Sequence, residues 1–495
     1  MTSRSYDVIV IGAGVIGSMV ARALSRYKLS ILLIDKASDV GSVTSAANTA
    51  IVHAGYNAVP GSLKAKMNVT GNPMWDQMAA ELNVSFERPG DYVVAIGPEE
   101  LPRLDQLIER GKRNGVTGMR LVSGEEMRRR EPKINPEVSG ALWASTGGIC
   151  DPFAVTIAAA ENAVMNGVEL MLETAFEDFV MADGCIRAVR TNRGEFGCRW
   201  AVNAAGLYAD RVMHRAGVRP EFTITPRRGE YFVLDRAEIT INNVLFPVPS
   251  AVSKGILVTT TTHGNAVLGP NAHEVEDRGN TAVTRPGLEE VWQGATKLIP
   301  DLEPRQVIAT FAGLRAGGNA PCETPSVHYG HDFVIEIPDA VPNLVNLGGI
   351  ESPGLTSAPA IAERAVALME EAGAKLEEKP GWNPIRPARP RFRNLSTEEQ
   401  AALVARDPRY GRIVCRCETV TEGEVVAEVH APIPATTYDA IKRRTWLGTG
   451  RCQGGFDKPR VVEILARELD QSPLTISKKG PASQFLTRPT KEVAR

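Results

Sequence analysis

The chain has few cysteines, almost no net charge and no long apolar run. Seven cysteines among 495 residues are too few, and odd in number, for a disulfide framework. Lysine and arginine total 56 against 58 acidic residues, a net charge of −2, which excludes a global field that attracts nucleic acid or an anionic membrane. No stretch reaches the ~18 apolar residues that span a bilayer. We therefore expect a cytoplasmic protein, peripheral to a membrane only through a partner.

The remaining composition is that of an ordinary folded protein. Apolar residues make up 43% of the chain and charged residues 23%, which excludes disordered and fibrous architectures. A length of 495 residues, at roughly 150 per domain, predicts about three folding units. The N-terminal apolar run is broken by Gly12 and Gly14, so it indicates a buried strand rather than a signal peptide.

The first 35 residues read as a complete strand-turn-helix-strand unit. Residues 6–11 form an apolar β-branched run and residues 15–27 carry an apolar stripe at helical spacing, with a glycine turn between them. A second strand over 30–34 leads directly into Asp35. This order is typical of a domain that binds a dinucleotide.

The glycines of this turn satisfy the pattern G-x-G-x-x-G. Gly12 permits the tight turn, Gly14 lets the backbone approach a pyrophosphate, and Gly17 lets the helix pack on the sheet. The helix N-terminus then faces the phosphate, and Asp35 is placed to bind a ribose hydroxyl. An acid at position 35 argues against a 2′-phosphate.

Two later segments favour FAD over NAD. Residues 196–206 form an apolar strand that ends in Asn-Ala-Ala-Gly, and residues 344–356 form another that runs into a glycine-rich segment ahead of a predicted helix at 358–373. Backbone N–H groups and a helix N-terminus at that place suit the electron-rich pyrimidine end of a reduced flavin.

On these residues the chain resembles the FAD-dependent oxidoreductases of the D-amino-acid oxidase superfamily, over about residues 5–372. With the C-terminal segment included, it most resembles the iron-sulfur-bearing glycerol 3-phosphate dehydrogenases of the anaerobic type and the related 2-hydroxyglutarate oxidases. The resemblance implies an α/β (α+β) fold, with a Rossmann-like FAD-binding domain interleaved with an antiparallel-sheet substrate domain. It also implies a small α-rich C-terminal [2Fe-2S] domain.

Domain boundaries follow from this resemblance and from one Pro/Arg-rich stretch. Residues 379–394 hold four prolines and four arginines, which suit neither a helix nor a central strand. We expect FAD-binding segments at about 1–90, 150–215 and 340–375, and substrate-domain segments at about 91–149 and 216–339, all within residues 1–378. A linker and short helix (379–410), a [2Fe-2S] domain (411–470) and an irregular, mobile tail (471–495) complete the chain.

The resemblance implies further cofactor contacts beyond the glycine turn. In this superfamily the segment after the ribose-binding acid passes the flavin, and here it reads SVTSAANTAIVHAGY over 42–56. The predicted FAD contacts are Gly12, Gly14, Gly17, Asp35, Lys36, Ser45, Asn48, Thr49, Thr174, Ala175, Ala205, Gly206, Gly348, Gly349, Gly354, Leu355 and Thr356.

Two residues are the candidates for catalysis. His53 lies where imidazole can accept the hydroxyl proton of a secondary alcohol as its C–H hydride goes to flavin N5; the alternative is a structural histidine bonded to backbone. Arg315, in FAGLRA, is similar to a family element that binds an anion, and its guanidinium holds phosphate or carboxylate equally well. The alternative for Arg315 is an interdomain salt bridge.

Four further residues are predicted to line the substrate pocket. Lys254 and His263 flank one predicted strand (255–262), and Tyr231 lies in another at the substrate-facing sheet. Tyr56 follows the flavin-facing segment. Each of these, taken singly, also fits a surface or structural role.

Three cysteines crowd into the last fifth of the chain. Cys415-Arg-Cys417 is followed after 34 residues by Cys452-Gln-Gly-Gly-Phe-Asp457, with flanks that resemble the [2Fe-2S] domain of bacterioferritin-associated ferredoxin. The family pattern is C-x-C and then C-x-x-x-x-C, so Asp457 occupies the fourth cysteine position. A carboxylate oxygen can bind ferric iron. Three outcomes stay open: a cluster held by three cysteines and Asp457, a vestigial domain without a cluster, or another metal such as zinc.

The leading interpretation is an FAD-dependent dehydrogenase that oxidises sn-glycerol 3-phosphate and passes electrons through the cluster to a quinone or an acceptor protein. The alternatives are oxidation of a carboxylate such as 2-hydroxyglutarate or a proline derivative, and an electron-transfer subunit of a larger complex. The substrate is a small anion in each enzyme reading. A homo-oligomer or additional subunits fit the sequence equally well.

Overall fold

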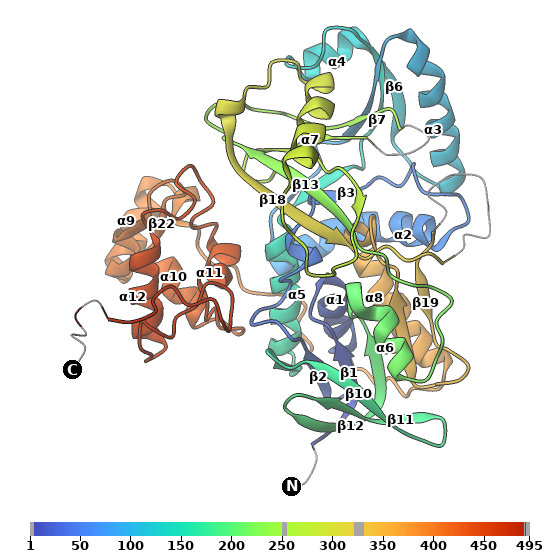
Figure 1. Cartoon of the computed structure of the whole chain (residues 1–495), viewed down its shortest axis with the longest axis vertical. Helices are drawn as coiled ribbons and strands as arrows, with labels where there is room; N and C mark the ends of the chain where they lie inside the picture. The colour runs from blue at the N-terminus through green and yellow to red at the C-terminus, as the bar shows by residue number, and fades with distance from the viewer. Residues whose placement is uncertain (1–3, 250–254, 321–330, 490, 492–495) are drawn as a thin grey trace.

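The first predicted strand lies at the centre of an eight-stranded sheet, in a computed structural model that describes residues 4–249, 255–320, 331–489 and 491 (Figure 1). The sheet consists of β1 (Ser5–Ile11), β2 (Ile31–Ile34), β9 (Glu169–Met171), β10 (Phe176–Ala182), β11 (Cys185–Thr191), β12 (Gly194–Asn203), β19 (Val334–Glu336) and β20 (Leu344–Gly348). The strands β9, β2, β1, β12 and β20 run parallel in that order. Antiparallel pairing adds β11 and β10 beside β12, and β19 beside β20.

Alternation along β1 explains the layers on the two faces of this sheet. Val8 and Val10 pack on one face in a core shared with the helices, whereas Ile9 and Ile11 pack on the other face with residues of β10 to β12 and α6. The helices are α1 (Val15–Leu24), α2 (Leu63–Leu82), α5 (Pro152–Met165) and α8 (Gly354–Glu371) in the first core, and α6 (Ala209–Arg215) in the second. The strand β1 is therefore buried on both faces, by the helices of the first core on one face and by the second core on the other.

A second, nine-stranded sheet is mostly antiparallel. In order it contains β17 (His273–Glu274), β13 (Arg227–Leu234), β16 (Ala266–Leu268), β15 (Val258–Thr260), β14 (Val244–Pro247), β5 (Asp91–Ile96), β7 (Val138–Ala144) and β6 (Met119–Ser123), with β18 (Val307–Arg315) on the other side of β13. Within the described strands of this second sheet, only β14 and β5 pair in parallel. The helices α3 (Leu101–Asn114), α4 (Gly124–Arg130) and α7 (Arg285–Leu298) pack their apolar residues on it.

Short elements complete the first 378 residues. A three-stranded sheet consists of β3 (Ile51–Val52), β8 (Gly148–Cys150) and β4 (Phe86–Glu87). Along the chain, β3 and β4 lie between β2 of the first large sheet and β5 of the second, and β8 lies between β7 and β9. The 3-10 turns are η1 (Thr44–Ala46), η2 (Pro98–Glu100), η3 (Gly206–Tyr208) and η4 (Pro304–Gln306).

Residues beyond 390 form a separate small helical domain at the side of the molecule (Figure 1). It contains η5 (Phe392–Asn394), α9 (Thr397–Arg406), η6 (Pro408–Gly411), β21 (Ile413–Cys415), β22 (Val420–Thr421), α10 (Glu422–Val429), α11 (Tyr438–Thr445) and α12 (Lys458–Glu468). Its core is a cluster of buried residues from β21 to α12 and the tail. The predicted fold class, an α/β FAD-binding domain with an antiparallel-sheet domain and a small α-rich domain, is confirmed.

Three details differ from the sequence expectations. Helix α8 begins at Gly354 rather than at 358, because Pro353 takes the N-cap position, and this puts Gly354 to Thr356 in the first helical turn. The expected strand at 255–262 shortens to β15, because a turn forms in which the N–H of Thr261 donates to the carbonyl of Asn265. The described residues of the tail form no helix or strand, but Ile476 is buried and the carbonyl of Ser477 accepts the N–H of Tyr438, so this part packs on the domain.

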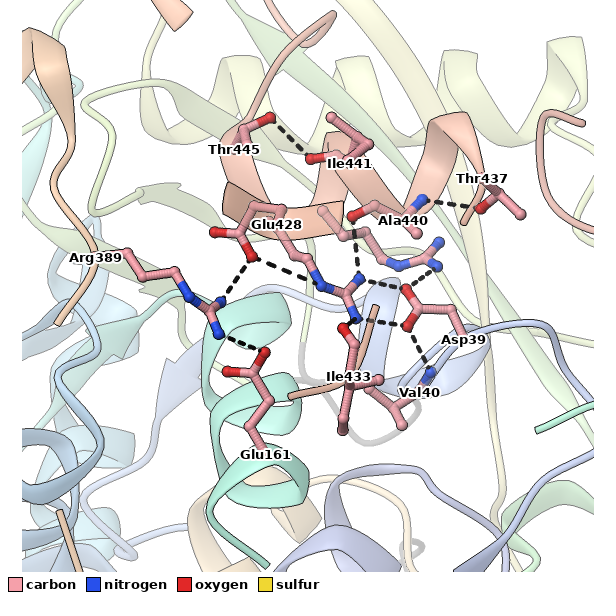
Figure 2. A network of polar contacts seen from close by, with 12 residues as sticks. Asp39, Val40, Glu161, Arg389, Glu428, Ile433, Thr437, Ala440, Ile441 and Thr445 are labelled. Atoms are coloured by element: carbon pink, nitrogen blue, oxygen red, sulfur yellow. Dashed lines mark hydrogen bonds and ion pairs between the residues drawn. The ribbon is translucent and has the colours of Figure 1, made fainter. Parts of the chain in front are cut away.

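A network of buried charges joins the helical domain to the domain of the eight-stranded sheet (Figure 2). Asp39, in the loop after β2, faces the guanidinium groups of α11. Both oxygens of Asp39 accept from Arg444 at 2.8 Å, and Oδ2 also accepts from Arg443 at 2.6 Å. Asp39 and Arg444 are both almost fully buried. Burial by itself raises the pKa of Asp39, but the two guanidinium groups outweigh it and hold that pKa below its usual value.

The same network continues through the Pro/Arg-rich segment. Arg389 donates to Glu428 of α10 at 2.7 Å and to Glu161 of α5 at 2.8 Å. Arg386 donates to the other oxygen of Glu161 at 2.5 Å. Glu161 has no exposed side-chain surface, so its two arginines compensate a fully buried carboxylate. The segment therefore clamps the two domains together through its arginines.

Replacing Asp39 with alanine removes the carboxylate that Arg443 and Arg444 share, and it leaves Arg444 with only the longer ion pair to Glu428, at 3.9 Å. We expect Asp39→Ala to destabilise the docked arrangement by about 3–5 kcal/mol, because removal of one partner of a buried ion pair costs about that much. Thermal unfolding then shows an earlier transition, and trypsin cuts within residues 379–394 faster. The control Glu125→Ala breaks an ion pair whose side chains are both mostly exposed, so its effect stays below about 1 kcal/mol. Equal trypsin rates in the two variants would contradict the role of Asp39.

Candidate active site and cluster site

A cavity of about 970 Å³ opens at the carboxyl ends of β1, β2 and β12. In parallel sheets the crevice outside these strand ends is the usual ligand site, and this volume is at the upper end of the range for such pockets. It is lined by most of the predicted cofactor contacts: Gly12, Gly14, Asp35, Lys36, Ser45, Asn48, Thr49, Thr174, Ala175, Ala205, Gly206, Gly354 and Leu355. The predicted catalytic and substrate residues His53, Arg315, Tyr56 and Tyr231 line the same cavity.

The glycine turn leaves no room for side chains at two of its positions. Gly12 has φ 105°, and a Cβ there would lie 2.5 Å from the carbonyl oxygen of Ala204. A Cβ on Gly17 would overlap the carbonyl oxygen of Gly12 at 1.8 Å. Gly17 does not line the cavity; it lets α1 approach the turn. The turn is thus built for close backbone contact with a phosphate group.

Asp35 lies at the end of β2 with its carboxylate fixed by backbone donors. Oδ2 accepts the N–H of Ala13 at 2.7 Å and Oδ1 accepts the N–H of Ala37 at 2.8 Å. Burial raises the pKa of Asp35, and the two N–H donors oppose that rise. Beside it, the ammonium of Lys36 lies 3.7 Å from the ring centroid of Tyr208. This arrangement places a fixed acceptor at the position expected for the ribose.

The loop after Asp35 is held by its own polar side chains. Ser45 Oγ accepts the N–H of Val15 at 2.9 Å, which ties the loop to the start of α1. Asn48 donates to the carbonyls of Thr44 and Ser45 and accepts the N–H of Ala50 at 2.8 Å. The cavity wall at this place is therefore held by hydrogen bonds within the chain.

His53 is positioned by α8 and α2. Its backbone N–H donates to Thr356 Oγ1 at 2.8 Å, and its backbone carbonyl accepts from the side chains of Asn68 and Asn72 at 2.9 and 3.0 Å. The ring Nε2 lies 3.3 Å from Ser352 Oγ. Thr356 itself does not line the cavity, so its observed role is to fix the backbone of His53.

Gly348 and Gly349 do not line the cavity, although the sequence predicts them at the flavin. A Cβ on Gly348 would lie 2.3 Å from the ring of Phe222, so this glycine serves packing. Gly349 has φ 65° and ends the strand in a left-handed conformation that favours glycine. Both residues shape the path of the chain from β20 into Glu351 and α8.

Arginines from two neighbouring strands line the cavity. Arg315 on β18 is paired in register with Arg227 on β13. Arg227 forms an ion pair with Glu351, which also binds Lys64 at 2.8 Å. Burial by itself raises the pKa of Glu351, but Lys64 and Arg227 overcome it and hold that pKa at about 2. Lys64 and Glu351 were not predicted, because no local pattern signals a charge cluster assembled from distant segments.

Arg315 differs from its neighbours in its partners. It donates to the carbonyl of Asn271 at 3.1 Å, and it lies beside the hydroxyl of Tyr231, whose ring stacks on Phe311 at 4.4 Å. Within the described ranges Arg315 forms no ion pair with a carboxylate. Its guanidinium therefore carries a positive charge into the cavity, and the interdomain salt bridge considered for it is not observed among those residues.

His263 lies away from the cavity, in contact with the helical domain. Its ring centroid is 3.8 Å from that of Trp446, and Trp446 donates through Nε1 to Asp151 Oδ2 at 2.7 Å. Phe153 packs on the same indole at 5.3 Å. His263 therefore belongs to an aromatic contact between the domains. Lys254, the other flanking residue, lies outside the described residues.

The three C-terminal cysteines and Asp457 lie in two contacting pairs. The Cys415 thiol is next to the Asp457 carboxyl, and the Cys452 thiol is next to that of Cys417. Burial, with a smaller contribution from Asp457, raises the pKa of Cys415 to about 11. Burial also acts to raise the pKa of Cys452, but Cys417 and the backbone N–H groups of the following glycine loop outweigh it and lower that pKa. Three thiols and one carboxyl are donors that suit iron.

Asp457 carries an orphaned oxygen at this place. The side chain is 1% exposed, Oδ1 accepts from Tyr438 at 2.7 Å, and Oδ2 has no hydrogen-bond partner within the described part of the chain. A buried anionic oxygen without a partner is costly, and a bound metal ion would compensate it. No group of three or more histidine, cysteine or acidic side chains in the described ranges is arranged to hold a single metal ion.

Comparison with known proteins shows the family of each of the two parts of the chain. Residues 7–368 match the family model of the FAD dependent oxidoreductases, and residues 413–467 match that of the BFD-like [2Fe-2S] binding domain. The chain belongs to this family of FAD-dependent oxidoreductases and carries a C-terminal [2Fe-2S] domain.

Individual relatives cover most of the chain. A glycerol 3-phosphate dehydrogenase of Caloramator mitchellensis is 44% identical over 490 residues, which cover 98% of this chain and 99% of that protein. A mitochondrial L-2-hydroxyglutarate dehydrogenase of Arabidopsis thaliana is 32% identical over 73% of this chain and 83% of its own. The structure of a dithionite-reduced L-alpha-glycerophosphate oxidase of Mycoplasma pneumoniae with FAD bound superposes with a TM-score of 0.72 at 31% identity, over 78% of this chain and 99% of that one.

No helix among the described residues is both long and apolar enough to cross a membrane.

Loss of the carboxylate at position 35 tests the dinucleotide site. We expect Asp35→Ala to weaken FAD binding at least 10-fold, because a hydrogen bond to a charged group contributes about 1.5–3 kcal/mol. Flavin absorbance retained per polypeptide after dilution and gel filtration measures this. Asp105→Ala, at an exposed position of α3, is the control and keeps its flavin. Equal flavin content in both variants would exclude Asp35 from the site.

Proposed function

We propose that this chain is an FAD-dependent dehydrogenase that oxidises sn-glycerol 3-phosphate to dihydroxyacetone phosphate. The observation that carries the proposal is the guanidinium of Arg315, which faces the cavity of the dinucleotide turn without an ion-pair partner among the described residues. A planar fork of N–H donors binds a phosphate strongly. The 44% identical relative named glycerol 3-phosphate dehydrogenase supports phosphate as the anion.

FAD would be held along the cavity by the residues that line it. The backbone at Gly12 and Gly14 would bind the pyrophosphate at the start of α1, and Asp35 would accept from the ribose. Ser45, Asn48 and Thr49 line the same cavity and would contact the flavin, and the N–H groups at the start of α8, at Gly354 and Leu355, would interact with its pyrimidine end. When bound, the flavin supplies a two-electron acceptor for hydride.

His53 is the proposed proton acceptor. Oxidation of the secondary alcohol releases the C–H hydrogen with its electron pair to the flavin and the O–H hydrogen as a proton, so a base is needed beside the hydroxyl. The backbone N–H and the carbonyl of His53 both form hydrogen bonds, which fix its backbone. Its ring Nε2 faces Ser352 at the cavity. Arg315 with Tyr231 would meanwhile hold the phosphate, so that the reacting carbon is oriented by both ends of the substrate.

Electrons would leave singly through a [2Fe-2S] cluster to a quinone or an acceptor protein. The proposed ligands are Cys415, Cys417, Cys452 and Asp457. Two contacts link the helical domain to the cavity wall. Trp446 of that domain donates to Asp151, and the backbone N–H of Cys150, the residue before Asp151, donates to the carbonyl of Ala50. A one-electron centre beside a two-electron flavin is useful where the final acceptor takes electrons one at a time.

A carboxylate substrate is the second candidate. The fork of Arg315 binds a carboxylate as well as a phosphate, and one relative is an L-2-hydroxyglutarate dehydrogenase. A role as electron-transfer subunit of a larger complex would instead leave the purified chain inactive until a partner is added. His53, Arg315 and the dinucleotide turn meet in one cavity, which favours an enzyme complete in itself.

Anaerobic bleaching of the flavin distinguishes these substrates. The purified protein is mixed with glycerol 3-phosphate, 2-hydroxyglutarate, lactate, proline or hydroxyproline, and absorbance near 450 nm is followed. We expect glycerol 3-phosphate to bleach the flavin fastest. Bleaching by carboxylates alone would exclude the phosphate proposal, and no bleaching without a partner protein would favour the subunit.

The fork of Arg315 is tested by a substitution that keeps its charge. We expect Arg315→Lys to lower the second-order rate constant of flavin reduction by the substrate more than 10-fold, because an ammonium lacks the paired donors. We expect FAD to stay bound in this variant. The control is Arg190→Lys on β11, an exposed residue of the first sheet. Unchanged kinetics in Arg315→Lys would assign Arg315 a structural role.

A further inference from the structure

The carboxyl of Asp457 accepts a hydrogen bond at one oxygen, and the Cys415 thiol lies next to this carboxyl. Tyr438, at the start of α11, donates its hydroxyl to Oδ1 at 2.7 Å, and both side chains are almost fully buried. Among the described residues no lysine, arginine or histidine forms an ion pair with Asp457, and Oδ2 is left without a hydrogen bond. One oxygen is thus satisfied by the protein and the other is left for a ligand.

Two glycines make room for the Tyr438 hydroxyl. A Cβ on Gly448 would lie 2.3 Å from that oxygen, and a Cβ on Gly454 would lie 2.2 Å from it. Both glycines have positive φ, of 73° and 79°. Gly448 donates its N–H to Cys415 Sγ at 3.5 Å, and Gly454 lies in the loop between Cys452 and Asp457. The hydroxyl is therefore seated between the two loops that carry the proposed iron ligands.

The ring of Tyr438 is fixed as firmly as its hydroxyl. It packs edge-on against Phe485 of the C-terminal tail, with centroids 5.6 Å apart at 77°. The backbone N–H of Tyr438 donates to the carbonyl of Ser477 in the same tail at 3.1 Å. The tail thus holds Tyr438 in the orientation that directs its hydroxyl at Asp457.

We propose that Tyr438 is a positioning residue that makes Asp457 a monodentate iron ligand, bound through Oδ2 in place of the fourth cysteine. The proposal rests on the cluster assigned above and specifies how its one oxygen ligand is held. With Oδ1 occupied by the hydroxyl, the carboxylate presents a single donor atom, as a cysteine sulfur does. Partners of this kind orient ligands and tune the metal, and their loss typically lowers metal affinity 10–100-fold.

The hydrogen bond also sets how strongly the carboxylate donates to iron. A donor on Oδ1 withdraws electron density from the carboxylate and so favours the more negative, reduced cluster. Loss of the hydroxyl therefore shifts the midpoint potential to a more negative value. It also frees Oδ1, which changes the geometry at that iron.

The experiment compares Tyr438→Phe with Tyr410→Phe in the full-length flavoprotein purified without oxygen. Tyr410 is the one other tyrosine after residue 380 and is a buried residue that packs on Gly423 of the same domain. Iron content, the electron paramagnetic resonance spectrum of the reduced protein, its midpoint potential and the rate of iron loss to a chelator are measured. Flavin content and the unfolding temperature check that both variants are folded.

We expect Tyr438→Phe to lose iron about 10-fold faster than Tyr410→Phe, with a shifted spectrum and a more negative potential. Asp457→Cys is expected to retain iron and give a different spectrum, and Asp457→Ala to retain less iron.

If Tyr438→Phe matches Tyr410→Phe in spectrum, potential and iron loss, the positioning role is wrong while the cluster stands. If Asp457→Ala keeps the wild-type spectrum, Asp457 is not a ligand. If the wild-type protein binds no iron even after reconstitution, the cluster of the proposed function fails as well.

Discussion

The buried ion pair between Asp39 and Arg444 is the contact on which the arrangement of the two redox domains depends. Two charges that are almost fully buried must stay paired, since either one alone in the interior costs several kcal/mol. Asp39 lies four residues after Asp35 and six before Ser45, so the loop that shapes the dinucleotide site also carries the acid that fixes the helical domain. A shift of that domain would unpair these charges, and the interface is therefore specific in position.

Near the proposed substrate site, one buried carboxylate again has two cationic partners. Glu351 forms an ion pair with both Lys64 and Arg227, so these two cations share one buried carboxylate. Arg315, directly across from Arg227 in the sheet, keeps its charge for a ligand. At the cluster end the pattern is the reverse. Asp457 is a buried acid without an ion pair among the described residues, and it lies beside the Cys415 thiol in the domain for which iron is proposed.

Much of the cofactor site could be predicted because its signals are local. The turn at Gly12 to Gly17 and the acid at Asp35 depend on backbone sterics and strand order within 35 residues, and the structure places them at one cavity. Details set by neighbours were not predicted. Helix α8 begins at Gly354 rather than 358, and His263 packs on Trp446 of another domain rather than at the substrate. Neither the cap at Pro353 nor an interdomain ring contact has a signature in the periodicity.

The sequence by itself determined the fold class, the dinucleotide turn and the unusual acid at position 457, because each follows from residue type and spacing along the chain. Only the tertiary structure decided which charges are neutralised. The pairing of Glu351 with Lys64 and Arg227, and that of Asp39 with Arg444, joins residues far apart in sequence. The hydroxyl of Tyr438 on Asp457 is likewise a product of packing, since two glycines and the C-terminal tail hold the ring in place. Burial and proximity are properties of the folded chain, and they select one partner among many of the same chemical type.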